Sequence, residues 1–105
     1  MPVGRTLALF AFATITAHVA IADVAATKIY AEQCAMCHGP DGKARTAMGK
    51  TLNMKDWSDG KTLYGMSDTD VGTEIHVGKQ SMPGFAQLSN EQIKALVEYI
   101  RSFQK

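Results

Sequence analysis

The clearest hydrophobic pattern in the chain lies at its C-terminal end, where apolar residues recur every three to four positions. These residues are Ile93, Leu96, Val97, Ile100 and Phe103. Lys94, Glu98 and Arg101 occupy the other face, so the pattern predicts an amphipathic helix. Ser89 and Gln92 have the spacing of a capping box, which places the start of this helix directly after Ser89.

Two further helices are predicted upstream. Ser67 and Asp70 repeat the capping-box spacing, and Gly78 is a plausible stop for the helix that they begin. The stretch "ATKIYAEQC", residues 26–34, contains neither Pro nor Gly and would end a first helix at Cys34.

Long connections separate these helices, roughly over residues 39–66 and 79–88, with a short helical turn expected near Lys55 to Tyr64. No stretch alternates apolar and polar residues over the length of a strand. We therefore expect an all-α domain of three to four helices. Loops this long in so small a domain usually wrap around something.

The N-terminus has the layout of a secretory signal peptide. After the basic Arg5, residues 7–22 carry no Asp, Glu, Lys or Arg, and Ala20-Ile21-Ala22 matches a small-residue cleavage site. An uncleaved membrane anchor is the alternative, but the apolar run is shorter than the about 20 residues of a membrane span. We predict a cleaved leader over residues 1–22, a domain over 23–105, and no stable membrane insertion after cleavage.

Charge excludes one class of partner. The chain of 105 residues has a formal charge of +1, and loss of Arg5 with the leader makes the remainder neutral. No run of like charge is present, so nothing indicates nucleic acid or an anionic membrane surface as a partner. Export would place the protein in the periplasm, where an unprotected cysteine pair would be oxidised.

The stretch "CAMCH", residues 34–38, contains the two cysteines of the chain. A redox-active disulfide of the thioredoxin type needs a preceding strand and a βαβ context, and neither is predicted. A zinc site could use Cys34, Cys37, His38 and His76, but a histidine adjacent to a ligating cysteine is poorly placed to bind the same ion.

The third interpretation is covalent haem, for which C-x-x-C-H is the recognised attachment signature. On a helical turn, Cys34 and Cys37 project to one side, where each could form a thioether with a haem vinyl group. His38 would then lie beneath the ring as the proximal iron ligand. Its second ring nitrogen would normally donate to a carbonyl, which fixes the orientation of the imidazole.

A sixth ligand is also present in the sequence. In "GKQSMPGF", residues 78–85, Met82 precedes Pro83 in the loop between the last two predicted helices. A thioether opposite an imidazole raises the reduction potential and suits electron transfer. Met48 and Met54 compete for this role, and His76 is a less favoured rival. Met82 is preferred because Pro83 stiffens a loop long enough to cross the distal face.

Residues 24–105 resemble the small single-haem class I cytochromes c of bacteria, similar to the c6, c551 and c553 groups. The matching pieces are "YAEQCAMCHGPDGK", "GKQSMPGF" and "LSNEQIKALVEYIRSF", which occur in the order of that family. The resemblance implies helices wrapped around one haem c, held by Cys34 and Cys37, with His38 and Met82 as iron ligands. Tyr30 and Tyr99 match positions where the first and last helices cross.

One departure from the family concerns His38. Family members often carry a proline near the carbonyl that receives the N–H of the proximal histidine, and this chain has Ala47 there. Which carbonyl orients His38 is therefore open. Trp57 resembles a position beside a haem propionate, to which its indole N–H could donate; a plain core role is the alternative.

From these features we expect a periplasmic, monomeric one-electron carrier that is not an enzyme. It would meet its redox partner proteins through transient docking at the haem edge. Two alternatives stay open. One is a haem subunit tightly bound to a dehydrogenase or oxidase complex, and the other is a haem sensor or peroxidase-like enzyme with a labile sixth ligand.

Overall fold

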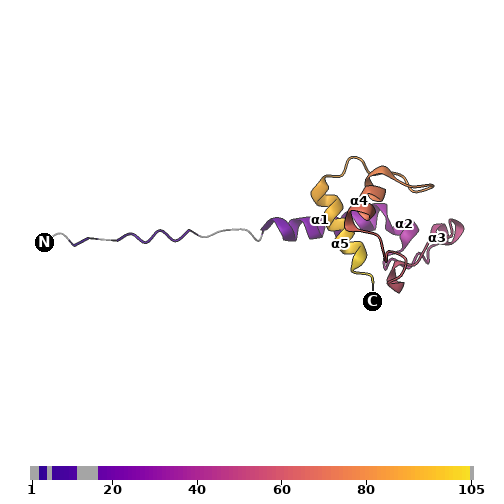
Figure 1. The fold of residues 1–105 in the computed structure, drawn as a ribbon, viewed down its shortest axis with the longest axis horizontal. Coiled ribbons are helices and arrows are strands. Elements are labelled where there is room, and N and C mark those ends of the chain that lie inside the picture. The colour runs from indigo at the N-terminus through magenta and orange to yellow at the C-terminus, as the bar shows by residue number, and fades with distance from the viewer. Residues whose placement is uncertain (1–2, 5, 12–16, 105) are drawn as a thin grey trace.

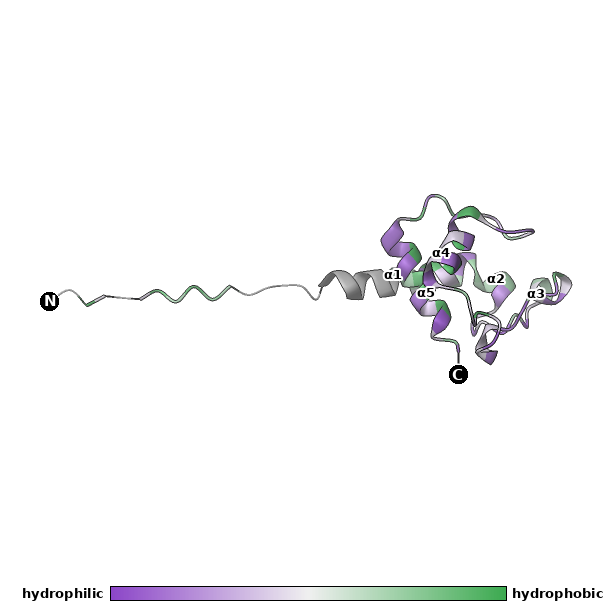
Figure 2. Ribbon diagram, in the orientation of Figure 1, coloured by the Kyte–Doolittle hydropathy of each residue, from purple (hydrophilic) through white to green (hydrophobic). Residues whose placement is uncertain are grey.

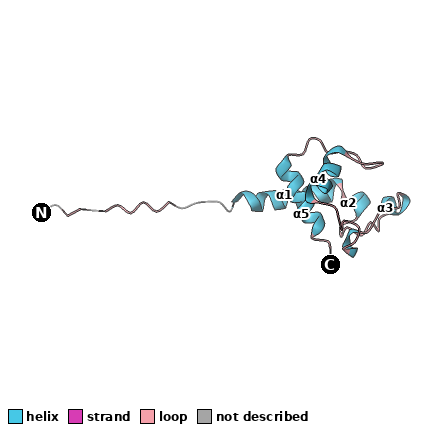
Figure 3. Cartoon of the chain, viewed as in Figure 1, coloured by secondary structure: helices cyan, strands magenta, loops and turns pink. Residues whose placement is uncertain are grey.

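A computed structural model describes residues 3–4, 6–11 and 17–104, which form a helical domain preceded by an extended N-terminal segment (Figure 1). Its elements are α1 (Ala17–Gln33), α2 (Ala35–His38), α3 (Ala47–Thr51), the 3-10 turn η1 (Trp57–Asp59), α4 (Asp68–Val77) and α5 (Asn90–Arg101). Helices and loops make up the described part of the chain, without a strand (Figure 3). The all-α prediction is confirmed.

The three long helices are those that the hydrophobic pattern predicted, with differences in extent. α4 begins and ends as expected, and α5 begins as expected but ends at Arg101, two positions before Phe103. α1 begins nine positions before Ala26 and runs through the predicted cleavage point after Ala22. Residues 1–2, 5 and 12–16 of the predicted leader lie outside the described residues. α2 and α3 add one short helix each, which brings the α-helices of the described chain to five.

Both predicted capping boxes are present. Ser89 Oγ accepts the N–H of Gln92 at 3.2 Å while Gln92 Oε1 accepts the N–H of Ser89 at 2.8 Å. Ser67 and Asp70 make the same reciprocal pair at the start of α4. These contacts satisfy backbone N–H groups that have no partner inside the helix.

The core forms where α1, α4 and α5 meet, and hydrophobic and hydrophilic residues alternate along α5 accordingly (Figure 2). Tyr30 of α1 and Leu96 of α5 are each 1 % exposed. The Tyr30 ring meets Tyr99 edge-on, with centroids 5.2 Å apart, and lies 5.2 Å from Phe103. The predicted crossing of the first and last helices at Tyr30 and Tyr99 is therefore confirmed.

A polar link on the other side of α5 connects it to the start of α4. Arg101 Nε donates to Asp68 Oδ1 at 2.5 Å, and Arg101 Nη2 donates to the carbonyl of Met66 at 2.6 Å. Arg101 sits on the face that the sequence pattern assigned to solvent. The three long helices thus form one body against which the loops pack.

The long connection after α2 contains the expected helical turn and one unexpected helix. η1 lies within the predicted Lys55 to Tyr64 stretch, capped by Asp56, whose Oδ1 accepts the N–H of Ser58 at 2.7 Å. α3 was not predicted; Thr46 caps it by accepting the N–H of Gly49 at 2.9 Å. Among the described residues, no helix is both long and apolar enough to cross a membrane.

Tyr30 also connects the core to the turn that carries the cysteines. Its buried hydroxyl donates to the carbonyl of Gly39 at 2.6 Å, and burial raises the pKa of this phenol above its usual range. We expect Tyr30→Phe to lower the free energy of unfolding by about 1–2 kcal/mol, because a buried hydrogen bond is lost and the Gly39 carbonyl keeps only the longer one, of 3.3 Å, from the N–H of Gly42. Denaturant titration of the complete protein measures this loss.

Tyr64→Phe is the matched control, because the Tyr64 side chain is 86 % exposed. It should change the free energy of unfolding by less than about 0.5 kcal/mol. Equal effects of the two substitutions would contradict the assigned role of the Tyr30 hydroxyl.

Candidate functional site

The CAMCH stretch directly follows α1 and consists of Cys34 and the short helix α2. Cys34 follows the last residue of α1 and caps α2; its carbonyl accepts the N–H of Cys37 at 3.2 Å and the N–H of His38 at 2.9 Å. Both cysteine thiols are free and partly buried. Burial, with a smaller contribution from Cys37, raises the pKa of Cys34 to about 11, so its thiol is neutral at physiological pH.

Two hollows meet at this turn, and together we call them the cleft. The outer hollow, of about 150 Å³, is lined by Cys34, Cys37, His38 and Met82, among others. The inner hollow, of about 70 Å³, is lined mainly by apolar core residues: Leu63, Val71, Ile75, Leu96 and Ile100. Cys34, His38 and Met82 line both hollows, so the structure brings three of the predicted site residues together across one cleft.

Met82 is positioned by a tight loop at the end of α4. Lys79 and Met82 exchange backbone hydrogen bonds of 3.1 and 2.9 Å, and the N–H of Phe85 donates to the carbonyl of Ile75 at 2.9 Å. Gly78 has φ +87°, and a Cβ there would lie 2.8 Å from the Met82 carbonyl oxygen. Lys79 also forms a 3.1 Å ion pair with Glu74 of α4. Backbone contacts and an ion pair thus hold the loop against α4.

The proximal candidate His38 is buried, with 8 % of its surface exposed. Desolvation lowers its pKa to about 4, so the imidazole is neutral at physiological pH, as a metal ligand must be. Its Nδ1 is buried and has no hydrogen-bond partner among the described residues. Ala47, at the position where the family often has proline, begins α3, and its carbonyl accepts the Thr51 hydroxyl at 2.9 Å.

Trp57 lies against His38. The indole and imidazole rings are stacked, with centroids 3.9 Å apart and an angle of 17° between the planes. Trp57 also lines the inner hollow. The indole therefore contacts the imidazole itself, a contact that the sequence did not indicate. Donation from its N–H to a propionate stays a prediction.

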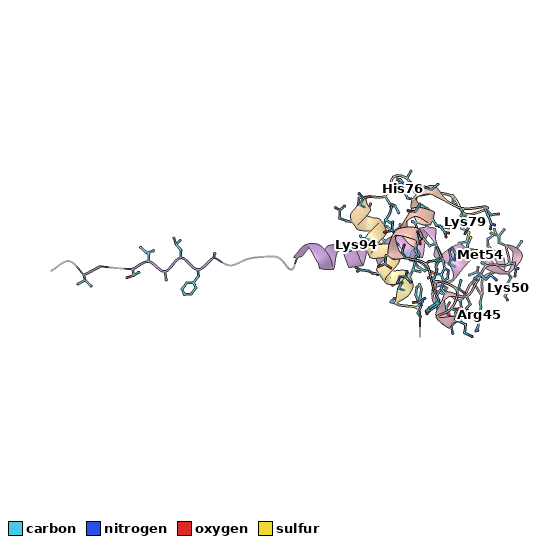
Figure 4. The ribbon with its side chains drawn as sticks, in the orientation of Figure 1. Arg45, Lys50, Met54, His76, Lys79 and Lys94 are labelled. Carbon is cyan, nitrogen blue, oxygen red and sulfur yellow. The ribbon has the colours of Figure 1, made fainter. Side chains whose placement is uncertain are left out.

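The rival ligands differ in where they lie. Met54 lines the outer hollow and shares one end of the domain with Lys79, Lys50 and Arg45 (Figure 4). His76 instead lines an open groove between α4 and α5, together with Lys94. The zinc interpretation is therefore wrong in its geometry, and no cluster of His, Cys, Asp and Glu suited to a metal ion occurs within the described part of the chain.

The residues that seat the CAMCH turn were missed at the sequence level. Ala44 N–H donates to the carbonyl of His38 at 2.9 Å, and the Thr46 hydroxyl donates to the carbonyl of Cys37 at 3.1 Å. Gly49 packs directly on this turn: a Cβ there would lie 2.5 Å from the carbonyl oxygens of both Cys37 and Ala44. A single sequence gives no signal for such a contact, because it depends on how the loop folds back.

The cleft fits a flat apolar group attached through two sulfurs. It is mostly apolar, two free thiols lie at one side, and a neutral imidazole and a thioether both line it. Nitrogen and sulfur donors of this kind are the axial ligands of c-type haem iron. The donor set of the described residues thus agrees with the haem interpretation.

Comparisons with known proteins agree with this geometry. Residues 22–100 match the family described as cytochrome C oxidase, cbb3-type, subunit III. The chain is 33 % identical over 96 residues to cytochrome c6 of Nostoc sp., covering 90 % of this chain and 82 % of that protein. It is 31 % identical over 87 residues to the cbb3-type cytochrome c oxidase subunit CcoP of Rhodobacter capsulatus, covering 74 % of this chain.

The chain spans only 28 % of the length of that CcoP subunit. Among solved structures, the KustC0563 c-type cytochrome is similar, with a TM-score of 0.68 and 30 % sequence identity. The match covers 76 % of this chain and 98 % of that one. Fold and sequence thus agree on the same class of domain.

Gly49 provides a test of how the turn is seated. We expect Gly49→Ala to destabilise the protein by about 1–3 kcal/mol, because the added methyl group overlaps two carbonyl oxygens and the loop must move away. The yield of protein with attached haem should fall as well. Denaturant titration measures the stability, and haem absorbance per unit of protein measures the yield of attached haem.

Lys50→Ala, at the next and exposed position of α3, is the control and should leave both quantities near those of the wild type. A Gly49→Ala variant as stable as Lys50→Ala would contradict the close approach of α3 to the CAMCH turn.

Proposed function

We propose that this chain, which belongs to the cbb3-type cytochrome c oxidase subunit III family of cytochrome c domains, is an exported one-electron carrier. As a cytochrome c domain it carries a covalently bound haem c. The observation that supports the proposal most is the convergence of Cys34, His38 and Met82 on one apolar cleft.

Haem c, when bound, supplies an iron that alternates between the ferric and ferrous states. Cys34 and Cys37 would attach it through thioethers, and His38 and Met82 would be the two protein ligands of the iron. A thioether ligand raises the reduction potential. Burial favours the ferrous state as well, because ferrous iron brings less positive charge into an apolar site than ferric iron does. The residues of the inner hollow exclude water from one side of the cleft.

We propose that the protein is not an enzyme, because iron held by both His38 and Met82 would have no position left for a substrate. The Met82 loop supports this reading, since its backbone contacts to α4 hold it in one arrangement. A sensor or peroxidase needs a labile sixth ligand, and nothing in this loop favours one.

A docking surface for redox partners lies where the cleft opens. Met36 of α2, Met48 of α3 and the adjoining Leu52 are large apolar side chains that are 69, 42 and 41 % exposed. Leu52 also lines the outer hollow, so exposed apolar surface reaches the cleft at this residue. A small apolar patch supports brief, specific contact with a partner that must be released after each transfer.

Export follows from the leader expected over residues 1–22, and we propose the periplasm as the site of action. A monomeric carrier fits the size of the domain. The alternative is a subunit of a larger complex, which is favoured by the similarity to CcoP subunits of cbb3-type oxidases.

Sedimentation of the exported protein distinguishes a free electron carrier from a subunit of a larger complex. A carrier should sediment as a monomer at micromolar concentration and co-purify with no other chain in stoichiometric amount. Recovery from its host in a fixed ratio with a second protein, resistant to high salt, would favour the subunit instead.

Met82→Ala tests the ligand set. We expect the variant to keep its covalent haem, to lose the weak far-red sulfur-to-iron band of the ferric protein, and to lower the reduction potential by on the order of a tenth of a volt or more. Optical spectra of both oxidation states, a pyridine haemochrome and a potentiometric titration provide the measurements.

Met54→Ala is the matched control, because Met54 lines the same outer hollow. It should keep the far-red band. Loss of the band in Met54→Ala but not in Met82→Ala would exchange the two roles, and the absence of attached haem in the wild type would refute the proposed function.

A further inference from the structure

We infer that Trp57 is a positioning residue that sets the orientation of the His38 imidazole by stacking on it, in place of the usual hydrogen bond to a carbonyl. The inference rests on the proposed function, since it takes His38 to be an iron ligand. It assigns Trp57 a role that does not involve its indole N–H.

The first support is the missing hydrogen bond. A ligating histidine almost always donates its second ring N–H to a carboxylate, a carbonyl or water, and this contact fixes the ring. Within the described part of the chain, Nδ1 of His38 is buried without such a partner. The carbonyl of Ala47, the first residue of α3, accepts the Thr51 hydroxyl. We therefore look to another contact for what orients the imidazole.

The second support is the geometry of the stack. At 3.9 Å between centroids and 17° between planes, the indole covers one face of the imidazole. A ring stacked in this way hinders rotation of its neighbour about the bond to the side chain, because any rotation brings the edges of the two rings into contact.

The third support is that Trp57 is itself held firmly. Its backbone N–H donates to the carbonyl of Gly42 at 2.8 Å, in the loop that follows the CAMCH turn. It begins η1, which Asp56 caps by accepting from both the backbone N–H and the hydroxyl of Ser58, at 2.7 and 2.6 Å. The hydroxyl of Thr62 further donates to the carbonyl of Asp56 at 2.9 Å. The indole is thus a fixed platform.

A chemical consequence follows for the iron. An imidazole that donates to a carbonyl is a more basic ligand, which favours the ferric state. With no acceptor at Nδ1 among the described residues and with the indole beside it, His38 would be a weaker donor to the iron, and the reduction potential would be higher. Stacking thus gives the orientation of the ring without the rise in basicity that a hydrogen bond brings.

Two variants of the holoprotein separate stacking from hydrogen bonding to a propionate. Trp57→Phe and Trp57→Leu both lack the indole N–H and both are apolar, but only Phe retains a flat ring. Each is converted to its ferric cyanide adduct, in which cyanide replaces Met82 and His38 remains. The proton shifts of the haem methyl groups then report the orientation of the imidazole plane.

We expect Trp57→Phe to keep the wild-type order of haem-methyl shifts and a potential close to that of the wild type. Trp57→Leu should change the order or compress the spread of these shifts, and should lower the potential as water gains access to Nδ1. Equal changes in the two variants would assign the effect to the indole N–H and overturn the inference. Wild-type shifts in Trp57→Leu would overturn it as well.

A measurement on the wild type decides the matter even if Trp57→Leu does not fold. In the ferrous protein, nuclear Overhauser contacts should join the indole protons of Trp57 to the ring protons of His38, and their absence would overturn the inference. If the wild type has a His/Met spectrum but lacks these Overhauser contacts, the stacking of Trp57 on His38 is refuted and the proposed function stands. A wild type without covalent haem refutes the proposed function and, with it, this role of Trp57.

Discussion

The rest of the site depends on the hydrogen bonds that the backbone carbonyls at the end of α2 accept. The last carbonyls of any helix lack partners within it; here they are those of Cys37 and His38, followed by the carbonyl of the capping residue Gly39. They accept from the Thr46 hydroxyl and the Ala44 N–H of the following loop and from the Tyr30 hydroxyl of α1, respectively. These three bonds tie the CAMCH turn to the following loop and to the helical core, so the thiols and the imidazole have one orientation.

The cleft extends from this seated turn into the core. Its inner wall is the apolar face shared by α4 and α5, and its far side is the Met82 loop, which the ion pair between Lys79 and Glu74 connects to α4. A domain this small buries little apolar surface with its own side chains. A covalently attached macrocycle contributes to the core while it serves as the redox centre, which explains why so much of the chain is loop.

Two ways of fixing an axial histidine differ in their electronic effect. A hydrogen bond at Nδ1 orients the imidazole and makes it more basic, whereas an aromatic ring stacked on its face orients it alone. If His38 binds the iron as proposed, its stack with Trp57 and the lack of an Nδ1 partner among the described residues would place this domain in the second category. Small changes in a loop far from the attachment motif can therefore alter the potential without changing either ligand.

The sequence by itself determined the three long helices, both capping boxes and the attachment motif, and it singled out His38 and Met82, which both line the cleft. Those features are local: helical periodicity, capping spacing and a five-residue motif depend on neighbours within a turn or two. The tertiary structure decided the helix α3, the close approach of Gly49, the partner of the Tyr30 hydroxyl and the stacking of Trp57 on His38. Each of these depends on contacts between residues that are distant in the chain and that meet when the loop after the motif folds back. Local sequence patterns do not determine the position of that loop.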